Sequence, residues 1–233
     1  MKTILFDLDG TLLPMDINQF LKIYFHEMSM VFKDVMAPDL LVDTVMKATK
    51  IMVKDVTDST NQTVFMQEFE RLIGHDISDY HDMWDVFYDT TYMNAKVSSY
   101  ERFEAIEAVK VLKEKGYQLV LATNPLFPET AILQRIQWAG LSPDDFSYIT
   151  SFEKNHYCKP QIQFYQEIID ALSLDPAECM MVGNDAQEDM VASKLGMKTY
   201  LIEDHILDRS EVSHEITYRG NYEDFLRFAK EEL

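Results

Sequence analysis

The chain has 233 residues, a length that allows one or two domains. Apolar types make up 47% of the residues and charged types 26%, as in a typical soluble globular protein. Lysine and arginine total 21 against 40 aspartates and glutamates, which gives a net charge of −19. This charge argues against nucleic acid or an anionic membrane as the main partner. An anionic substrate would therefore need a few local positive groups or a metal ion.

The two cysteines, Cys158 and Cys179, form neither a disulfide framework nor a zinc motif. No stretch approaches the ~18 continuous apolar residues of a membrane helix. The apolar run at the N-terminus meets two aspartates too soon for a signal peptide. These features predict a soluble, cytoplasmic protein, either a monomer or a homodimer, without a membrane partner.

The first predicted element is a short buried strand over 3–8, and a helical segment follows it. Apolar residues at i, i+3, i+4 spacing run over 17–32, and weaker stripes cover 40–52, 64–73 and 80–88. The expected helix N-caps are Asp16, Thr60 or Asn61, and Ser78. About four helices with short loops predict an all-helical domain, a four-helix bundle, over 15–98.

Beyond residue 98, predicted helices and strands alternate. Helices are expected over 101–115, 128–139, 162–172 and 188–195, and strands over 118–122, 147–150, 179–182 and 198–202. Such alternation implies right-handed crossovers and a parallel sheet. We therefore expect an α/β core over 1–14 and 99–233, with a Rossmann-like parallel sheet flanked by helices. Ligands of such sheets bind at the carboxyl ends of the strands.

Polar residues that can take part in catalysis or metal binding stand at these strand ends. Asp7 and Asp9 leave the first strand at i and i+2, a spacing that points both side chains to one face. Two clustered carboxylates repel each other in an acidic chain, which suggests a bound cation such as Mg²⁺. An acidic turn is the alternative interpretation of this pair. Three later segments favour the interpretation of Asp7 and Asp9 as a functional pair. The first contains Thr123 and Asn124, the second Lys159, and the third Asn184, Asp185 and Asp189.

In this order and at these positions, the segments resemble the four motifs of the haloacid dehalogenase (HAD) superfamily of phosphotransferases. The first motif, hhhDxDGT, matches 4–11 without a mismatch, and the second matches 120–124. The third is the step Lys159-Pro160, and the fourth is 182–185 followed by Asp189. The subfamily that this arrangement resembles, phosphoglycolate phosphatases and β-phosphoglucomutases, carries a helical cap between the first two motifs. The segment 15–98 would be that cap.

The resemblance implies a role for each matched residue. Asp7 would attack phosphorus and form an aspartyl-phosphate, and Asp9 would be the general acid and base. Thr123, Asn124 and Lys159 would hold the phosphoryl oxygens. Mg²⁺ would bridge Asp7, the Asp9 carbonyl and the substrate phosphate.

The fourth motif departs from the usual family pattern, because Asn184 stands directly after the glycine and Asp185 follows. A carboxylate binds Mg²⁺ better than an amide does, so Asp185 is the expected ligand and Asn184 the alternative. Asp189 would be a second ligand through water or a partner that orients Lys159.

The function predicted is Mg²⁺-dependent hydrolysis of a small phosphate monoester, a phosphorylated metabolite that the sequence does not identify. A phosphomutase on the same machinery is an alternative, and a non-catalytic interaction protein with this fold is another. Lys47, Lys50 and Lys54 of the cap are candidates for substrate contact, although a solvated helix face explains their spacing as well.

Overall fold

The computed structural model describes residues 1–76, 80–209 and 213–233. Its core is one six-stranded sheet in which every described pairing is parallel, with the strand order β3-β2-β1-β4-β5-β6. The strands are β1 (Thr3–Phe6), β2 (Gln118–Leu121), β3 (Tyr148–Ile149), β4 (Cys179–Gly183), β5 (Lys198–Ile202) and β6 (Tyr218–Gly220). The expected α/β class and the parallel, Rossmann-like sheet are confirmed.

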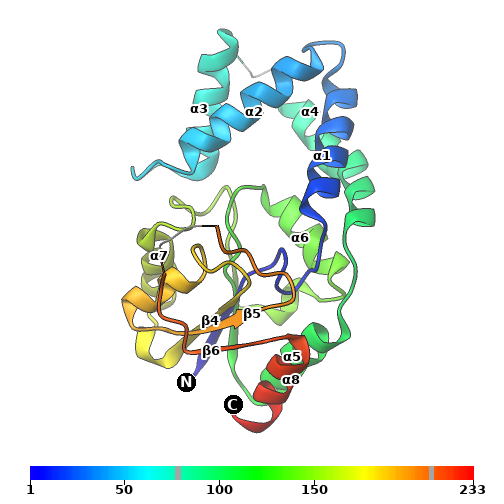
Figure 1. Cartoon of the computed structure of the whole chain (residues 1–233). Coiled ribbons are helices and arrows are strands. Elements are labelled where there is room, and N and C mark those ends of the chain that lie inside the picture. Colours follow the sequence, from blue (N-terminus) through cyan, green and yellow to red (C-terminus); the bar gives the residue numbers. More distant parts are fainter. Residues whose placement is uncertain (77–79, 210–212) are drawn as a thin grey trace.

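Strand β1 lies in the middle of the sheet, between β2 and β4. All four of its residues are buried, and successive side chains point to opposite faces. Ile4 and Phe6 pack in one apolar cluster with residues of three helices, α5 (Phe103–Glu114), α6 (Glu129–Trp138) and α8 (Tyr222–Glu231). Leu5 packs on the other face with α7 (Ile162–Leu172) and the 3₁₀ helix η6 (Met190–Leu195). The sheet is thus covered on both faces (Figure 1).

The segment between β1 and α5 is helical, as expected. It contains α1 (Ile17–Phe32), α2 (Pro38–Met52), α3 (Asn61–Ile73) and α4 (His81–Val86), followed by a π-helical turn η2 (Phe87–Thr91) and the 3₁₀ helix η3 (Tyr92–Ser98). Asp16 and Thr60 cap α1 and α3 through their side chains, as predicted. The predicted cap Ser78 lies outside the described residues. The division into a core and a cap domain at residues 14 and 99 stays a prediction.

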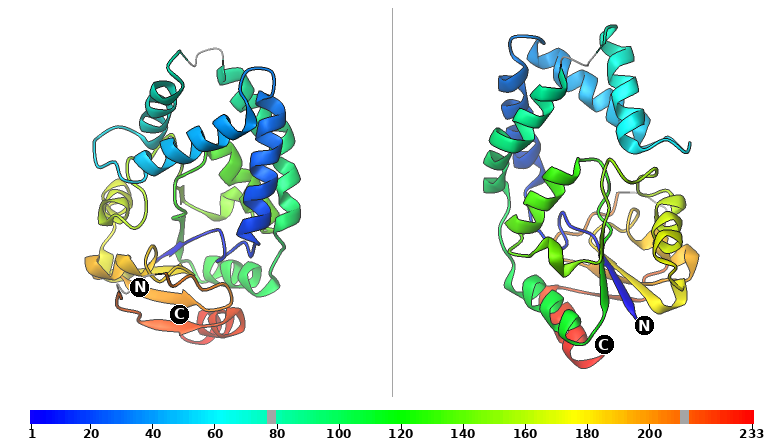
Figure 2. Two further views of the ribbon diagram at one scale, coloured as in Figure 1. Left: turned by 45° about the horizontal axis from the view of Figure 1, so that its top comes forward. Right: turned by 180° about the vertical axis from the view of Figure 1, so that it is seen from behind.

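The helical segment lies over the carboxyl ends of the strands (Figures 1 and 2). Hydrogen bonds at several places join it to the core, among them those that the side chains of Gln134 and Gln161 donate to carbonyls of the segment. At its base, the Asp16 amide donates to the Ser98 carbonyl, and Met15 pairs with Ser99 in an isolated bridge, so the two chain connections to the core lie side by side. At its far end, the amides of Asn61 and Gln62 donate to the carbonyls of Asn155 and Phe152, at 2.9 Å each.

Some elements differ from the prediction. The expected helix over 188–195 is a shorter 3₁₀ helix, and β1 ends at Phe6 because the chain turns back there, with Leu13 donating to the Leu8 carbonyl. The pair β6 and α8 was not predicted. Strand β6 has only three residues and no apolar run, whereas Tyr222, Phe225 and Phe228 of α8 follow a helical spacing that would have revealed it. None of the described helices is long and apolar enough to cross a bilayer.

Candidate active site

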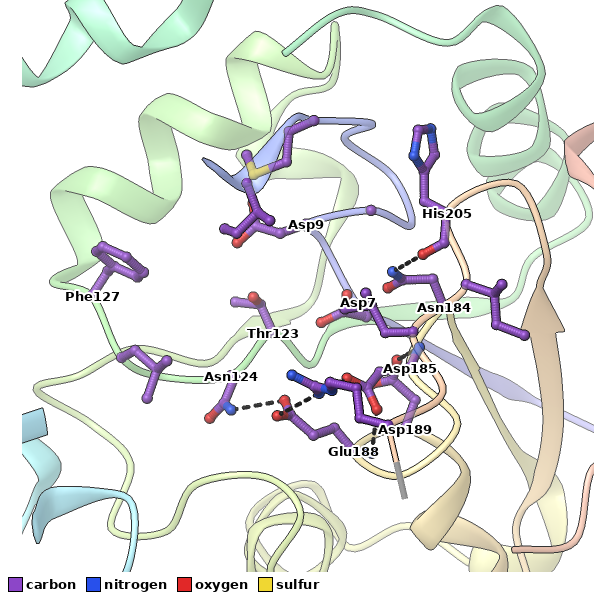
Figure 3. A pocket seen from close by; sticks show the side chains of 17 residues that line it. Asp7, Asp9, Thr123, Asn124, Phe127, Asn184, Asp185, Glu188, Asp189 and His205 are labelled. Carbon is purple, nitrogen blue, oxygen red and sulfur yellow. Dashed lines mark hydrogen bonds and ion pairs between the residues drawn. The ribbon is translucent and has the colours of Figure 1, made fainter. Parts of the chain in front are cut away.

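Three adjacent strands bring the predicted residues together. Asp7 follows β1, Thr123 follows β2, and Asn184 and Asp185 follow β4, so their positions meet at one edge of the sheet. Together they line a cavity of about 470 Å³ (Figure 3). The other predicted residues in its lining are Asp9, Asn124 and Asp189. Lys159 is not part of the lining, but its ammonium contacts two residues that are, Asp7 and Asp189.

Lys159 is 1% exposed and lies between two carboxylates. Its Nζ is 2.9 Å from Asp7 Oδ1 and 2.6 Å from Asp189 Oδ1. Burial lowers the pKa of Lys159, but the negative charges of Asp189 and Asp7 outweigh it and hold the pKa well above its usual value. The ammonium is therefore charged at neutral pH and fixes the Asp7 carboxylate in place.

Asp189 is itself held on both sides, since its Oδ2 accepts from the Asp185 amide at 2.9 Å. Its carboxylate also fills the space above Gly183, where a Cβ would lie 2.6 Å from Asp189 Cβ. A glycine at this strand end therefore lets the Asp189 side chain reach Lys159.

Asp9 points away from Asp7 and is paired with Arg135 of α6. Arg135 is 1% exposed, and its guanidinium stacks on the Phe127 ring with 4.3 Å between Cζ and the ring centroid. Burial raises the pKa of Asp9 above its usual value, while the charge of Arg135 opposes that rise. A carboxyl group whose pKa is raised can donate a proton closer to neutral pH.

Asn184 and Asp185 have different partners. Asn184 Nδ2 donates to the His205 carbonyl at 2.7 Å, and its Oδ1 lies 3.1 Å from the Thr11 hydroxyl. Asp185 Oδ1 accepts two backbone amides, and its Oδ2 is paired with Arg209. Both side chains line the cavity, so the choice between them as metal ligand stays a prediction.

Thr123 and Asn124 follow β2. Thr123 is buried, and its carbonyl accepts from the Thr150 hydroxyl at 2.6 Å, which fixes the backbone at this point. Asn124 Oδ1 accepts the Lys159 amide at 3.2 Å, and Nδ2 donates to Glu188 Oε2 at 3.0 Å. Asn124 thus links the second and third motifs.

The cavity offers oxygen donors of the kind that Mg²⁺ takes. Asp7 and Asp185 present carboxylates, and the guanidinium of Arg209 already occupies part of the acidic edge, between Asp185 and Glu188. The described residues contain no cluster of three or more carboxylate, imidazole or thiol groups arranged as a metal site. Mg²⁺ needs no such cluster, because it is held by one or two carboxylates together with water and substrate phosphate. The donor set therefore fits a magnesium ion.

Four residues of the site were not predicted: Thr11, Arg135, Glu188 and Arg209. A helical-face argument could have found Arg135, because it follows the buried Ile132 by three residues. Thr11 was part of the first motif, and its position beside Asp7 Oδ2, at 3.3 Å, explains its presence there. Arg209 lies in an irregular segment where no periodicity indicates a side-chain direction.

The lysines proposed for substrate contact do not line the cavity. Lys47 pairs with Asp43 on the exposed surface of α2 at 2.7 Å. The structure thus supports the interpretation of Lys47 as part of a solvated helix face.

Comparison with known proteins gives relatives over most of the chain. A "D-glycero-beta-D-manno-heptose-1,7-bisphosphate 7-phosphatase" from Haemophilus ducreyi is 28% identical over 46% of this chain and 71% of its own. "Pyrophosphatase PpaX" from Bacillus pumilus is 24% identical over 84% of this chain and 81% of its own. A "HAD phosphatase from Thermococcus onnurineus" has the same fold, with a TM-score of 0.61, 18% identity and coverage of 98% and 97%. Residues 1–195 match the haloacid dehalogenase-like hydrolase family, and the chain belongs to that family.

Proposed function

We propose that the protein is a Mg²⁺-dependent phosphatase that hydrolyses a small phosphate monoester through an aspartyl-phosphate. The observation that carries this proposal is the position of Asp7, held by Lys159 at 2.9 Å, in a cavity that Asp9 and Asp185 also line. A fixed carboxylate nucleophile, a second carboxyl group and a site for a cation are what phosphoryl transfer from an ester requires.

In the first step, a carboxylate oxygen of Asp7 attacks phosphorus, and the bond from phosphorus to the ester oxygen breaks. Asp9 gives its proton to that departing oxygen. In the second step, Asp9 takes a proton from a water molecule, and the water oxygen attacks phosphorus, which releases phosphate and restores Asp7. The raised pKa of Asp9 favours the protonated form that the first step needs.

The remaining residues position the phosphoryl group. Thr123 supplies a hydroxyl to the cavity, and Asn124 lines it with its side-chain amide fixed by Lys159 and Glu188, while Lys159 also holds Asp7. Mg²⁺, bound by Asp7, the Asp9 carbonyl and Asp185 or Asn184, would neutralise charge on the phosphoryl oxygens. The names of the two curated relatives support phosphate-ester or phosphoanhydride chemistry for this chain. Under this proposal the substrate is a small phosphorylated metabolite, and the reaction takes place in the cytoplasm.

The test is release of phosphate from 4-nitrophenyl phosphate with and without Mg²⁺, in the wild type and in Asp7→Asn. We expect the variant to lose at least about 10⁴-fold in kcat while it keeps its fold, because the amide fills the same space but is no nucleophile. Asp16→Asn is the matched control, since Asp16 is exposed and caps α1 outside the cavity. Equal activity of Asp7→Asn and wild type would disprove the proposal.

A further inference from the structure

A second cavity, of about 590 Å³, lies between the helical segment and the core. Its size is typical of small-molecule sites. Aromatic side chains from both parts line it, among them Phe20, Tyr24, Phe25, Phe65, Trp84 and Phe127. The rings also contact one another, with centroids 5.6 Å apart for Tyr24 and Phe127 and 6.3 Å for Phe65 and Trp84. The walls are therefore preformed apolar surfaces on which a flat group can stack.

This aromatic cavity continues the cavity around Asp7. Asp9, Leu126 and Phe127 line both of them. Under the proposed function, Asp9 protonates the oxygen that leaves phosphorus, so that oxygen must lie beside Asp9. With the phosphoryl group at Asp7, the rest of the alcohol then extends from Asp9 into the aromatic cavity.

The charges in the lining exclude a second anionic group on that alcohol. Four carboxylates line the aromatic cavity, those of Asp9, Asp85, Asp89 and Glu153. Two guanidiniums, those of Arg135 and Arg209, face them in the described lining, so negative groups outnumber positive ones there. A second phosphate or a carboxylate would therefore lose its hydration and meet like charge.

We propose that the aromatic cavity binds the alcohol part of the substrate, and that this alcohol is uncharged and carries an aromatic ring. This inference rests on the proposed function and names its substrate class. It sets the chain apart from the two curated relatives, whose names refer to a bisphosphate and to pyrophosphate.

The test compares esters whose alcohols leave equally well. We expect kcat/KM for 2-phenylethyl phosphate to exceed that for n-propyl phosphate by about tenfold to hundredfold, the usual effect of burying one ring. A carboxylate in the para position of the ring should cancel most of this gain. Inorganic pyrophosphate should be hydrolysed no faster than n-propyl phosphate.

Two variants test whether the preference for the aromatic ester arises in the aromatic cavity. Phe25 lines the cavity and is partly buried, whereas Phe103 of α5 is 69% exposed and lies outside its lining. Phe25→Ala should lower the preference for the aromatic ester, measured as the ratio of the two kcat/KM values, about fivefold. Phe103→Ala should change neither substrate. The ratio of the two substrates in one sample corrects for any loss of folded protein.

The outcomes separate this inference from the proposed function. If every ester is hydrolysed without preference, or if the carboxylated ester or pyrophosphate is preferred, the phosphatase stands and the aromatic cavity is not the alcohol site. If no ester is hydrolysed, the proposed function fails, and calorimetric titration with 2-phenylethylphosphonate and n-propylphosphonate decides the inference. Tighter binding of the aromatic phosphonate, weakened in Phe25→Ala, supports it, and equal binding overturns it.

Discussion

The Arg135 guanidinium is paired with the Asp9 carboxylate, under the ring of Phe127. Arg135 comes from α6 in the core, and Asp9 follows the central strand β1, so the pair joins two elements 126 residues apart in the sequence. The positive charge of Arg135 opposes the rise that burial causes in the pKa of Asp9, and its planar guanidinium fixes the direction of that carboxylate. Arg135 is therefore a positioning residue for the proposed acid and base.

Arg135→Met removes the charge that opposes the rise in the pKa of Asp9. The pKa of Asp9 should then rise further, and the basic limb of the kcat/KM profile, above which Asp9 has lost the proton that the first step needs, should move to higher pH. We expect kcat at pH 7 to fall by about tenfold to hundredfold, because the Asp9 carboxyl group is no longer held in one direction. Arg135→Lys keeps the charge and should restore the position of the limb, although not the full rate. An unchanged pH profile in Arg135→Met would contradict this role.

Arg209 and a magnesium ion would compete for Asp185. The guanidinium of Arg209 is paired with Asp185 and is 3.3 Å from Glu188, while the side chain is 56% exposed and free to leave. Arg209→Met should therefore lower the Mg²⁺ concentration that gives half-maximal activity, by about threefold or more. Arg71→Met is the matched control, because Arg71 forms an exposed pair with Glu68 on α3. A higher magnesium requirement in Arg209→Met would show that the arginine assists the metal instead.

Gly10 takes a left-handed backbone conformation, with φ of 85°, directly beneath Asn184. A Cβ at this position would overlap the Asn184 amide, 2.9 Å from its Cγ. Gly10→Ala should lower the free energy of unfolding by about 2–4 kcal/mol, from backbone strain together with the clash. Gly74 has a similar φ of 78° but open space around it, so Gly74→Ala should cost only about 1 kcal/mol. Urea unfolding of both variants measures the difference, and equal costs would refute the clash.

Both cysteines should be unreactive in the folded protein. Burial raises the pKa of Cys158 to about 12 and that of Cys179 to about 11. Because the thiolate is the reactive form, alkylation by iodoacetamide at pH 8.5 should be negligible and should increase as the pH rises toward these values. In urea both thiols should react fully within minutes. Rapid labelling of the native protein at pH 8.5 would contradict the burial of these groups.

The strand-end residues could be predicted because a parallel sheet brings its carboxyl ends to one edge. Asp7, Thr123 and Asp185 stand within a few residues of the ends of apolar runs, and the parallel topology places them together. The helical segment over 17–73 could also be predicted, because its apolar stripes and the caps Asp16 and Thr60 agree with one another.

The electrostatic partners could not be predicted in the same way. The helical spacing from Ile132 indicates that Arg135 faces the core, but nothing in the local sequence indicates that Phe127 covers it or that Asp9 is its partner. Its role depends on a contact with Asp9 that only the packing of α6 against the β1 loop creates. The aromatic cavity likewise joins residues from α1, α3 and the loop after β2, and no single segment carries its pattern.

The hydrogen bonds from Asn61 and Gln62 to the core have a consequence for how molecules enter and leave. The helical segment is attached at two opposite ends, so it cannot swing outward about one hinge while these bonds persist. Any wide opening must first break them, and the two amides would then exchange their protons with solvent. The rate of hydrogen exchange at residues 61 and 62 would thus report how often the segment opens. Where the product leaves by this route, the opening frequency is an upper limit on the turnover rate.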